Sequence, residues 1–162
     1  MDPRIELVVP GKEEMIKTVK DLFNEYAESL DFSLCFQGFD EELAGLPGEY
    51  GPPYGRLLLA FHDNDRAGCA ALRRIDETTC EMKRLYLRPQ FRGSGFGKRM
   101  AAEIIKMAQE IGYERMRLDT APTMREAISL YHSLGFKEIG PYRDNPIDGA
   151  IFMELALSLP NA

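Results

Sequence analysis

The chain has few residues that bind metals or form disulfides. Its cysteines are Cys35, Cys69 and Cys80, no two of them form a C-x-x-C pair, and its histidines are His62 and His132. Metal sites and disulfide frameworks are therefore not expected, and a reducing cytoplasm is the predicted location.

Long apolar runs and long basic runs are also missing. The longest purely apolar stretch covers residues 57–61, far short of the roughly 20 residues needed to cross a bilayer. The start of the chain, residues 1–4, does not resemble a signal peptide. Lys and Arg number 20 against 26 Asp and Glu, a net charge of −6. We therefore expect neither a membrane nor a nucleic acid as a partner.

Length and composition are those of one small globular domain. The chain has 162 residues, 44% of them hydrophobic, which is enough for one core. It contains no repeat, low-complexity tract or linker, so residues 1–162 are predicted to form a single domain.

A glycine-rich, cationic turn at residues 92–99 lies between a predicted strand and a predicted helix. The strand-like residues 81–87 end before Pro89, and apolar residues then recur at helical spacing from Met100 until Gly112. Glycines let backbone N–H groups approach a ligand closely, and the N-terminus of a helix carries partial positive charge. The turn is therefore predicted to bind phosphate.

Two familiar phosphate motifs do not fit this turn. A dinucleotide fingerprint needs glycine where Lys98 stands, and a Walker A loop needs glycine at Arg92 and Ser or Thr at Arg99. What remains is the pattern Arg92-x-x-Gly95-x-Gly97, which follows a strand that ends in proline.

This pattern resembles the loop with which the GNAT superfamily of N-acetyltransferases binds the pyrophosphate of acetyl-CoA. A second motif follows at a suitable distance and looks like the last conserved helix of that family: Ala127-x-x-Leu130-Tyr131-x-x-x-Gly135-Phe136. The resemblance extends over the whole chain and is to a bacterial-type, single-domain member. It implies acetyl-CoA as cosubstrate and no metal.

The residue pattern predicts strands and helices in an order that the resemblance also implies. Strands are expected at 5–9, 56–61, 67–75, 79–87, 116–120, 137–139 and 150–157, with helices around 15–26, 98–111 and 124–134. Residues 30–55 are predicted to be a long loop with at most a short helix. The GNAT-like fold class is α+β, with a mixed, mostly antiparallel sheet of about six or seven strands flanked by helices and two splayed parallel strands in its middle.

The resemblance assigns the cofactor contacts to the strand end and the turn. Backbone groups of Leu85, Tyr86 and Leu87 are expected to bond the pantetheine arm. The remaining cofactor-binding residues are those of the turn: Arg92, Gly93, Ser94, Gly95, Phe96, Gly97 and Lys98. Many family members have asparagine where this chain has Met124, which leaves Thr123 and Arg125 as substitutes for that contact.

Tyr131 matches the family tyrosine that contacts the CoA sulfur, and a phenol is protonated at neutral pH. The resemblance therefore implies direct transfer through a tetrahedral intermediate, with Tyr131 as the general acid. From the residues alone, Tyr131 is also consistent with an ordinary core tyrosine.

Glu81 is the candidate general base by its position on the strand before the turn. Alternation places Glu81, Lys83 and Leu85 on one face, so an ion pair of Glu81 with Lys83 or with a cross-strand partner is the alternative. Asp119, Thr120 or a backbone carbonyl with a water wire could also serve as the base. His132 is expected on the surface.

Two segments bear on the acceptor, which is expected to be a small-molecule amine or amino acid. Residues 31–54 carry five acids and no Lys or Arg, which suits a cationic amine as well as it suits a solvated loop. Residues 142–149 include Arg143, which leaves zwitterions open. A non-catalytic acetyl-CoA-binding or regulatory module and a peptide or protein N-terminal acetyltransferase are the alternative functions, and a homodimer is left open.

Overall fold

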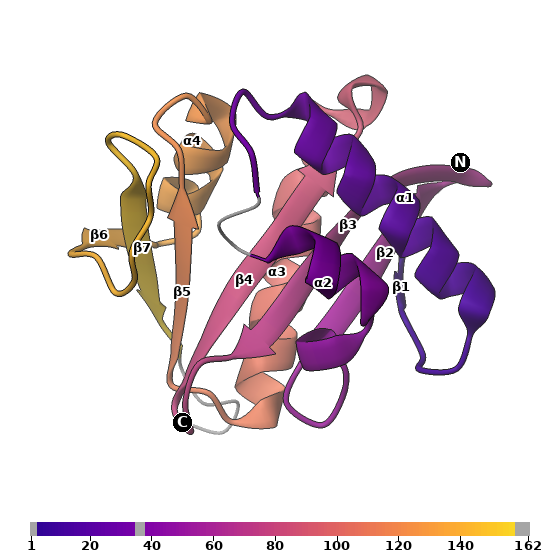
Figure 1. The fold of residues 1–162 in the computed structure, drawn as a ribbon, viewed down its shortest axis with the longest axis horizontal. Helices are drawn as coiled ribbons and strands as arrows, with labels where there is room; N and C mark the ends of the chain where they lie inside the picture. The colour runs from indigo at the N-terminus through magenta and orange to yellow at the C-terminus, as the bar shows by residue number, and fades with distance from the viewer. Residues whose placement is uncertain (1–2, 35–37, 158–162) are drawn as a thin grey trace.

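The computed structural model describes residues 3–34 and 38–157 (Figure 1). Cys35 lies outside the described residues. The elements are β1 (Pro3–Leu7), α1 (Glu13–Ser29), α2 (Phe39–Ala44), β2 (Arg56–His62), β3 (Asp65–Arg74), β4 (Thr79–Leu87), α3 (Phe96–Ile111), β5 (Arg115–Thr120), α4 (Arg125–Ser133), β6 (Lys137–Ile139) and β7 (Ile151–Ala156), with 3-10 turns at Gly48–Tyr50 and Pro89–Phe91. The predicted element order is confirmed.

The seven strands form one sheet in the order β1-β2-β3-β4-β5-β7-β6. Every neighbouring pair is antiparallel except β4 and β5, whose parallel pairing covers only residues 79–81 and 115–117. Beyond these residues the two strands diverge and leave their inner edges unpaired with each other. The predicted fold class, a mostly antiparallel sheet with two splayed parallel strands, is confirmed.

Helices cover both faces of the sheet. In Figure 1, α1 and α2 lie in front of the strands, and α3 lies behind them. Strand alternation divides the core accordingly: in β2, Leu57 and Leu59 pack under α1, whereas Leu58 packs under α3. The buried faces of α1 and α3 carry the amphipathic stripes that the sequence predicts, which is why these helices remain on the sheet.

A β-bulge in β4 changes which side chains share a face. The β3–β4 register shifts between Cys69 and Ala71, and Arg84 adopts a left-handed conformation with φ of 58°. Leu85 consequently packs in the core under α3, on the face opposite Lys83. The expectation that Leu85 shares a face with Glu81 and Lys83 is wrong, because simple alternation cannot cross a bulge.

An ion pair attaches α2 to β4 within the predicted long loop. The buried guanidinium of Arg84 donates to both carboxylate oxygens of Glu42, at 2.9 Å and 2.8 Å. A bidentate pair of this kind constrains both partners. It holds α2 beside the middle of the sheet. None of the described helices is long and apolar enough to cross a membrane.

Gly68 permits the close approach of β3 and β4 beside the bulge. A Cβ at this position would lie 2.1 Å from the carbonyl oxygen of Tyr86. We expect Gly68→Ala to lower the free energy of unfolding by about 1–3 kcal/mol, since the strands must separate to admit a methyl group. Urea denaturation measures this loss. Gly140→Ala, with no atom within 4 Å of the new Cβ, is the control, and equal midpoints for the two variants would contradict the prediction.

Candidate active site

The glycine-rich turn presents the N-terminus of α3 without a cap. Gly93 and Gly95 have positive φ values of 87° and 83°, and Gly95 is the N-cap residue. Glycine provides no capping side chain, and the first turn of α3 has no acidic residue. The first N–H groups of a helix lack intrahelical partners, so this terminus is suited to an anion.

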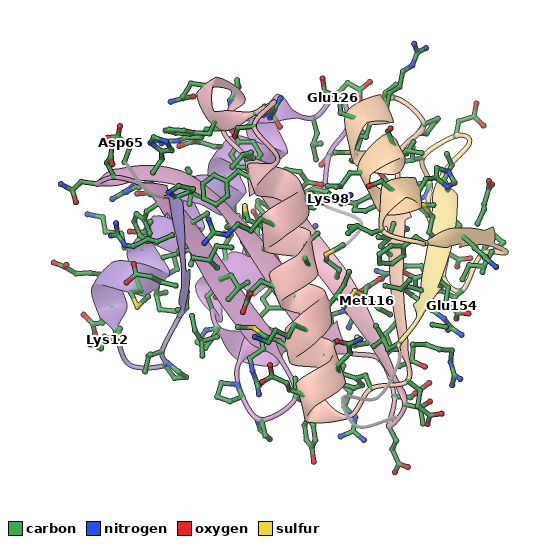
Figure 2. All side chains as sticks on the ribbon, turned by 180° about the vertical axis from the view of Figure 1, so that it is seen from behind. Lys12, Asp65, Lys98, Met116, Glu126 and Glu154 are labelled. Atoms are coloured by element: carbon green, nitrogen blue, oxygen red, sulfur yellow. The ribbon has the colours of Figure 1, made fainter. Side chains whose placement is uncertain are left out.

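A cavity of about 580 Å³ runs from this turn along the end of β4 and the first turns of α4. It is lined by these predicted cofactor residues: Leu85, Tyr86, Leu87, Arg92, Gly93, Gly95, Gly97 and Lys98. Its volume is in the range of ordinary ligand sites. Lys98 of α3 and Glu126 of α4 line it from two helices (Figure 2).

Two predicted cofactor residues are absent from this lining. The side chain of Phe96 is buried in the core under α3, and Ser94 donates its hydroxyl to the carbonyl of Phe91 at 3.3 Å. Their backbone groups remain part of the turn. Thr123, Met124 and Arg125 all line the cavity, so the chain has polar groups on both sides of the methionine that replaces the family asparagine.

A second, narrower pocket adjoins the large cavity. Its volume is about 40 Å³, and it shares Tyr26, Leu85 and Met124 with the large cavity. Tyr131 and Asp119 line only the narrow pocket. A ligand that fills the large cavity would therefore contact the shared residues and lie next to the pocket that Tyr131 lines.

Tyr131 lies on α4 with its side chain directed into the core. It is 8% exposed and stacks edge-on against Phe136. Burial raises the pKa of its phenol above the usual value. Within the described part of the chain, the hydroxyl has no hydrogen-bond partner. Its proton is therefore retained at neutral pH and is available to a ligand.

Glu81 lies in a buried network of three partners. It is fully buried and is the cross-strand neighbour of Arg73, whose Nε donates to it at 2.6 Å. Tyr142 donates its hydroxyl to the other carboxylate oxygen at 2.6 Å, and Arg143 forms an ion pair there. The expected alternative, an ion pair with a cross-strand partner, is present. Glu81 lines none of the described pockets.

Asp119 lines the narrow pocket from the end of β5. It accepts a hydrogen bond from Asn145 at 3.1 Å, and Nε of Arg143 lies 3.7 Å from its carboxylate. Thr120 lines the same pocket. The structure thus brings Asp119, Thr120 and Tyr131 together, whereas the histidine next to Tyr131, His132, is exposed as expected.

Sequence reasoning missed two residues of this site. Tyr26 of α1 lines both cavities, and Lys83 lines the narrow pocket. The position of Lys83 beside Glu81 was a signal for a polar face of β4. Nothing in the sequence places Tyr26 of α1 in one pocket with residues of β4 and β5.

Two acids of the predicted long loop form ion pairs with arginines. Glu42 pairs with Arg84, and Glu49 lies 3.3 Å from Arg73. These two carboxylates are therefore neutralised within the protein. No group of three His, Cys, Asp or Glu side chains within 3–34 and 38–157 is placed to hold a metal ion.

Known proteins resemble this chain in sequence and in fold. Residues 17–136 match the Acetyltransferase (GNAT) family. An uncharacterized N-acetyltransferase of Schizosaccharomyces pombe is 42% identical over 141 residues, which are 86% of each chain. An acetyltransferase of Streptococcus agalactiae has the same fold, with a TM-score of 0.79 at 21% identity over 96% of this chain and 98% of the other.

A second solved structure holds a ligand. The putative acetyltransferase of Salmonella typhimurium, determined with its cofactor acetyl-CoA, has a TM-score of 0.72 at 20% identity over 99% of this chain and 96% of the other. At this identity the likeness concerns the fold.

Proposed function

Because the chain belongs to the GNAT family of acetyltransferases, we infer that it transfers the acetyl group of acetyl-CoA directly to a primary amine. It is an acetyl-CoA-dependent acyltransferase. The large cavity supports this function most strongly, since it leaves room for a cosubstrate and adjoins the pocket that Tyr131 and Asp119 line.

The large cavity suits acetyl-CoA in shape and charge. We propose that the uncapped N-terminus of α3, with Arg92 and Lys98, binds the pyrophosphate, because backbone N–H groups and cations both favour an anion there. The backbone at Leu85 to Leu87 lies along the same cavity and would bond the pantetheine amides. Bound acetyl-CoA supplies an activated thioester.

Tyr131 is proposed as the general acid. Its hydroxyl keeps its proton because burial raises the phenol pKa, and no described side chain competes for it. A phenol this weakly acidic acts first as a hydrogen-bond donor to the charge that develops on sulfur when the tetrahedral intermediate collapses. It then protonates the departing thiolate and regains a proton from the amine nitrogen, which loses one as the amide forms, so that no phenolate remains.

Two carboxylates compete for the role of base. Glu81 as general base stays a prediction, and its oxygens already contact Arg73, Tyr142 and Arg143. Asp119 lines the pocket of Tyr131, where an acceptor amine would enter. These contacts favour Asp119, directly or through water.

Amide substitutions distinguish the two carboxylates. We expect Asp119→Asn to lower kcat/KM by at least about tenfold below the acceptor's pKa, where the amine must lose a proton, and by less above it. Glu81→Gln is expected to lower kcat/KM less but to lower the stability more, because it removes a counter-charge from two arginines. Kinetics over a pH series measure kcat/KM, and thermal unfolding measures the stability of each variant. A larger, pH-dependent loss of kcat/KM in Glu81→Gln than in Asp119→Asn would assign the base to Glu81.

A panel of amines tests the activity itself. Thiol release from acetyl-CoA, measured with small amines, amino acids and peptide N-termini, identifies the acceptor class. Release with small acceptors supports the proposal, and release with peptides alone would favour a protein N-terminal acetyltransferase. Binding of acetyl-CoA with no acetylation of any amine would favour a non-catalytic, regulatory module.

A further inference from the structure

Lys83 is a lysine in the wall between the narrow pocket and the surface under α2. It projects from β4 just before the bulge and lines the narrow pocket together with Tyr131 and Asp119. It also lines a hollow formed with α2 and the turn at 48–50. Lys83 therefore shares a pocket with the two residues proposed for the chemistry.

The arginines around Lys83 have carboxylate partners. Arg84 is held by Glu42, and Arg73 is held by Glu81 and Glu49. Arg143 pairs with Glu81. Among the described residues, no carboxylate lies within 4.0 Å of the Lys83 amine and no hydrogen-bond partner is found for it.

The surroundings of Lys83 disfavour an unpaired ammonium group. Burial, together with the neighbouring Arg84 charge, lowers the pKa of Lys83 to about 8. The side chain is still mostly charged at neutral pH. Glu42 and Asp119 act in the opposite direction and raise the pKa, but neither forms an ion pair with Lys83. A bound anion would add a counter-charge in direct contact with the ammonium group.

A residue of the neighbouring strand gives the same pocket a complementary charge. Asp119 on β5 faces the pocket that Lys83 lines from β4. A zwitterionic acceptor would find a partner for each charge there, with its amine toward Asp119 and its carboxylate toward Lys83. A purely cationic amine would leave Lys83 unpaired and repelled.

We propose that Lys83 binds a carboxylate of the acceptor, so that the substrate class of this enzyme is amines that carry a carboxylate, amino acids among them. This assignment rests on the proposed N-acetyltransferase activity. Lys83 determines specificity, whereas Tyr131 and the base perform the chemistry.

Matched acceptors test the assignment. Each amino acid in a panel is compared with its primary amide, which removes the carboxylate charge and retains the amine. We expect the wild-type enzyme to favour the free acid. Lys83→Met should raise KM for the acid by about tenfold to a hundredfold and leave the amide within about threefold, since only the acid loses a charged partner. An amino acid and its amide differ in amine pKa, but this difference is the same for both enzymes. It therefore cancels when the acid-to-amide KM ratio of Lys83→Met is divided by that of the wild type.

Two further variants control for charge and for folding. Lys83→Arg keeps a cation and is expected to retain part of the preference for the acid. Lys106→Met makes the same exchange at an exposed lysine of α3, outside the pockets described. It should change KM for neither the acid nor the amide. Thermal unfolding checks that all variants fold.

A binding measurement gives a readout independent of turnover. By calorimetry with CoA present, the wild type should bind an N-acetyl amino acid more tightly than its amide, and Lys83→Met should abolish the difference. Equal KM values and equal affinities of the wild type for acid and amide would overturn the assignment. An equal loss of kcat for both acceptors in Lys83→Met would also overturn it. If neither acids nor amides are acetylated, both the proposed N-acetyltransferase activity and the proposed role of Lys83 are wrong. If both are acetylated equally, only the proposed role of Lys83 is wrong.

Discussion

Tyr131→Phe is expected to lower kcat by about a hundredfold or more while the affinity for acetyl-CoA changes little. The substitution keeps the ring that packs against Phe136 and removes only the hydroxyl. The loss is expected across the neutral pH range, because the raised pKa keeps the wild-type phenol protonated throughout it. Steady-state kinetics with an identified acceptor and calorimetry with CoA measure the two effects.

Tyr54→Phe is the matched control for this prediction. Tyr54 is 50% exposed and lies outside the two cavities, so removal of its hydroxyl should leave kcat unchanged. If Tyr131→Phe turns over near the wild-type rate at every pH, Tyr131 is a packing residue.

Gly95→Asp is expected to weaken CoA binding by about a hundredfold or more, equivalent to about 2.8 kcal/mol. The new carboxylate would stand at the uncapped N-terminus of α3, where it would cap the N–H groups and repel the pyrophosphate. A side chain at φ of 83° also strains the turn. Calorimetry with CoA on the folded variant measures the loss.

Two variants separate charge from strain in this result. Gly95→Asn has nearly the same shape without the charge and should weaken binding less. Gly112→Asp introduces the same residue at φ of 109° at the other end of α3, and no atom lies within 4 Å of its new Cβ. It should lower stability without changing CoA affinity. Unchanged affinity in a folded Gly95→Asp would remove the turn from the cofactor site.

The fold was largely predictable because its signals are local. The apolar stripes of α1 and α3 and the alternation in β2 depend on side chains only a few residues apart. Boundaries moved by a few residues, as for α3, which begins at Phe96 rather than 98. The bulge at Arg84 could not be predicted, since a left-handed φ at an arginine has no local sequence signal.

In the candidate site, too, the parts that are continuous in sequence were predictable and the contacts between distant segments were not. The turn at 92–98 is continuous in sequence, so its glycines and cations were sufficient to predict an anion site, and the cavity lies along it. The partners of Glu81 come from β3 and from the segment before β7. Pairing at such separations depends on register and loop path, which sequence patterns specify weakly.

By itself, the sequence determined the class of the protein: the order of helices and strands, the glycine-rich turn and the tyrosine motif each lie in short, continuous segments. Only the tertiary structure decided how the residues around the narrow pocket are arranged. It packed α1 against β3 and β4, paired Arg84 and Arg73 with acids of the long loop, and brought Lys83 and Asp119 into the lining of one pocket. Charges acquire partners through space, and contacts between distant segments form only when the sheet brings them together.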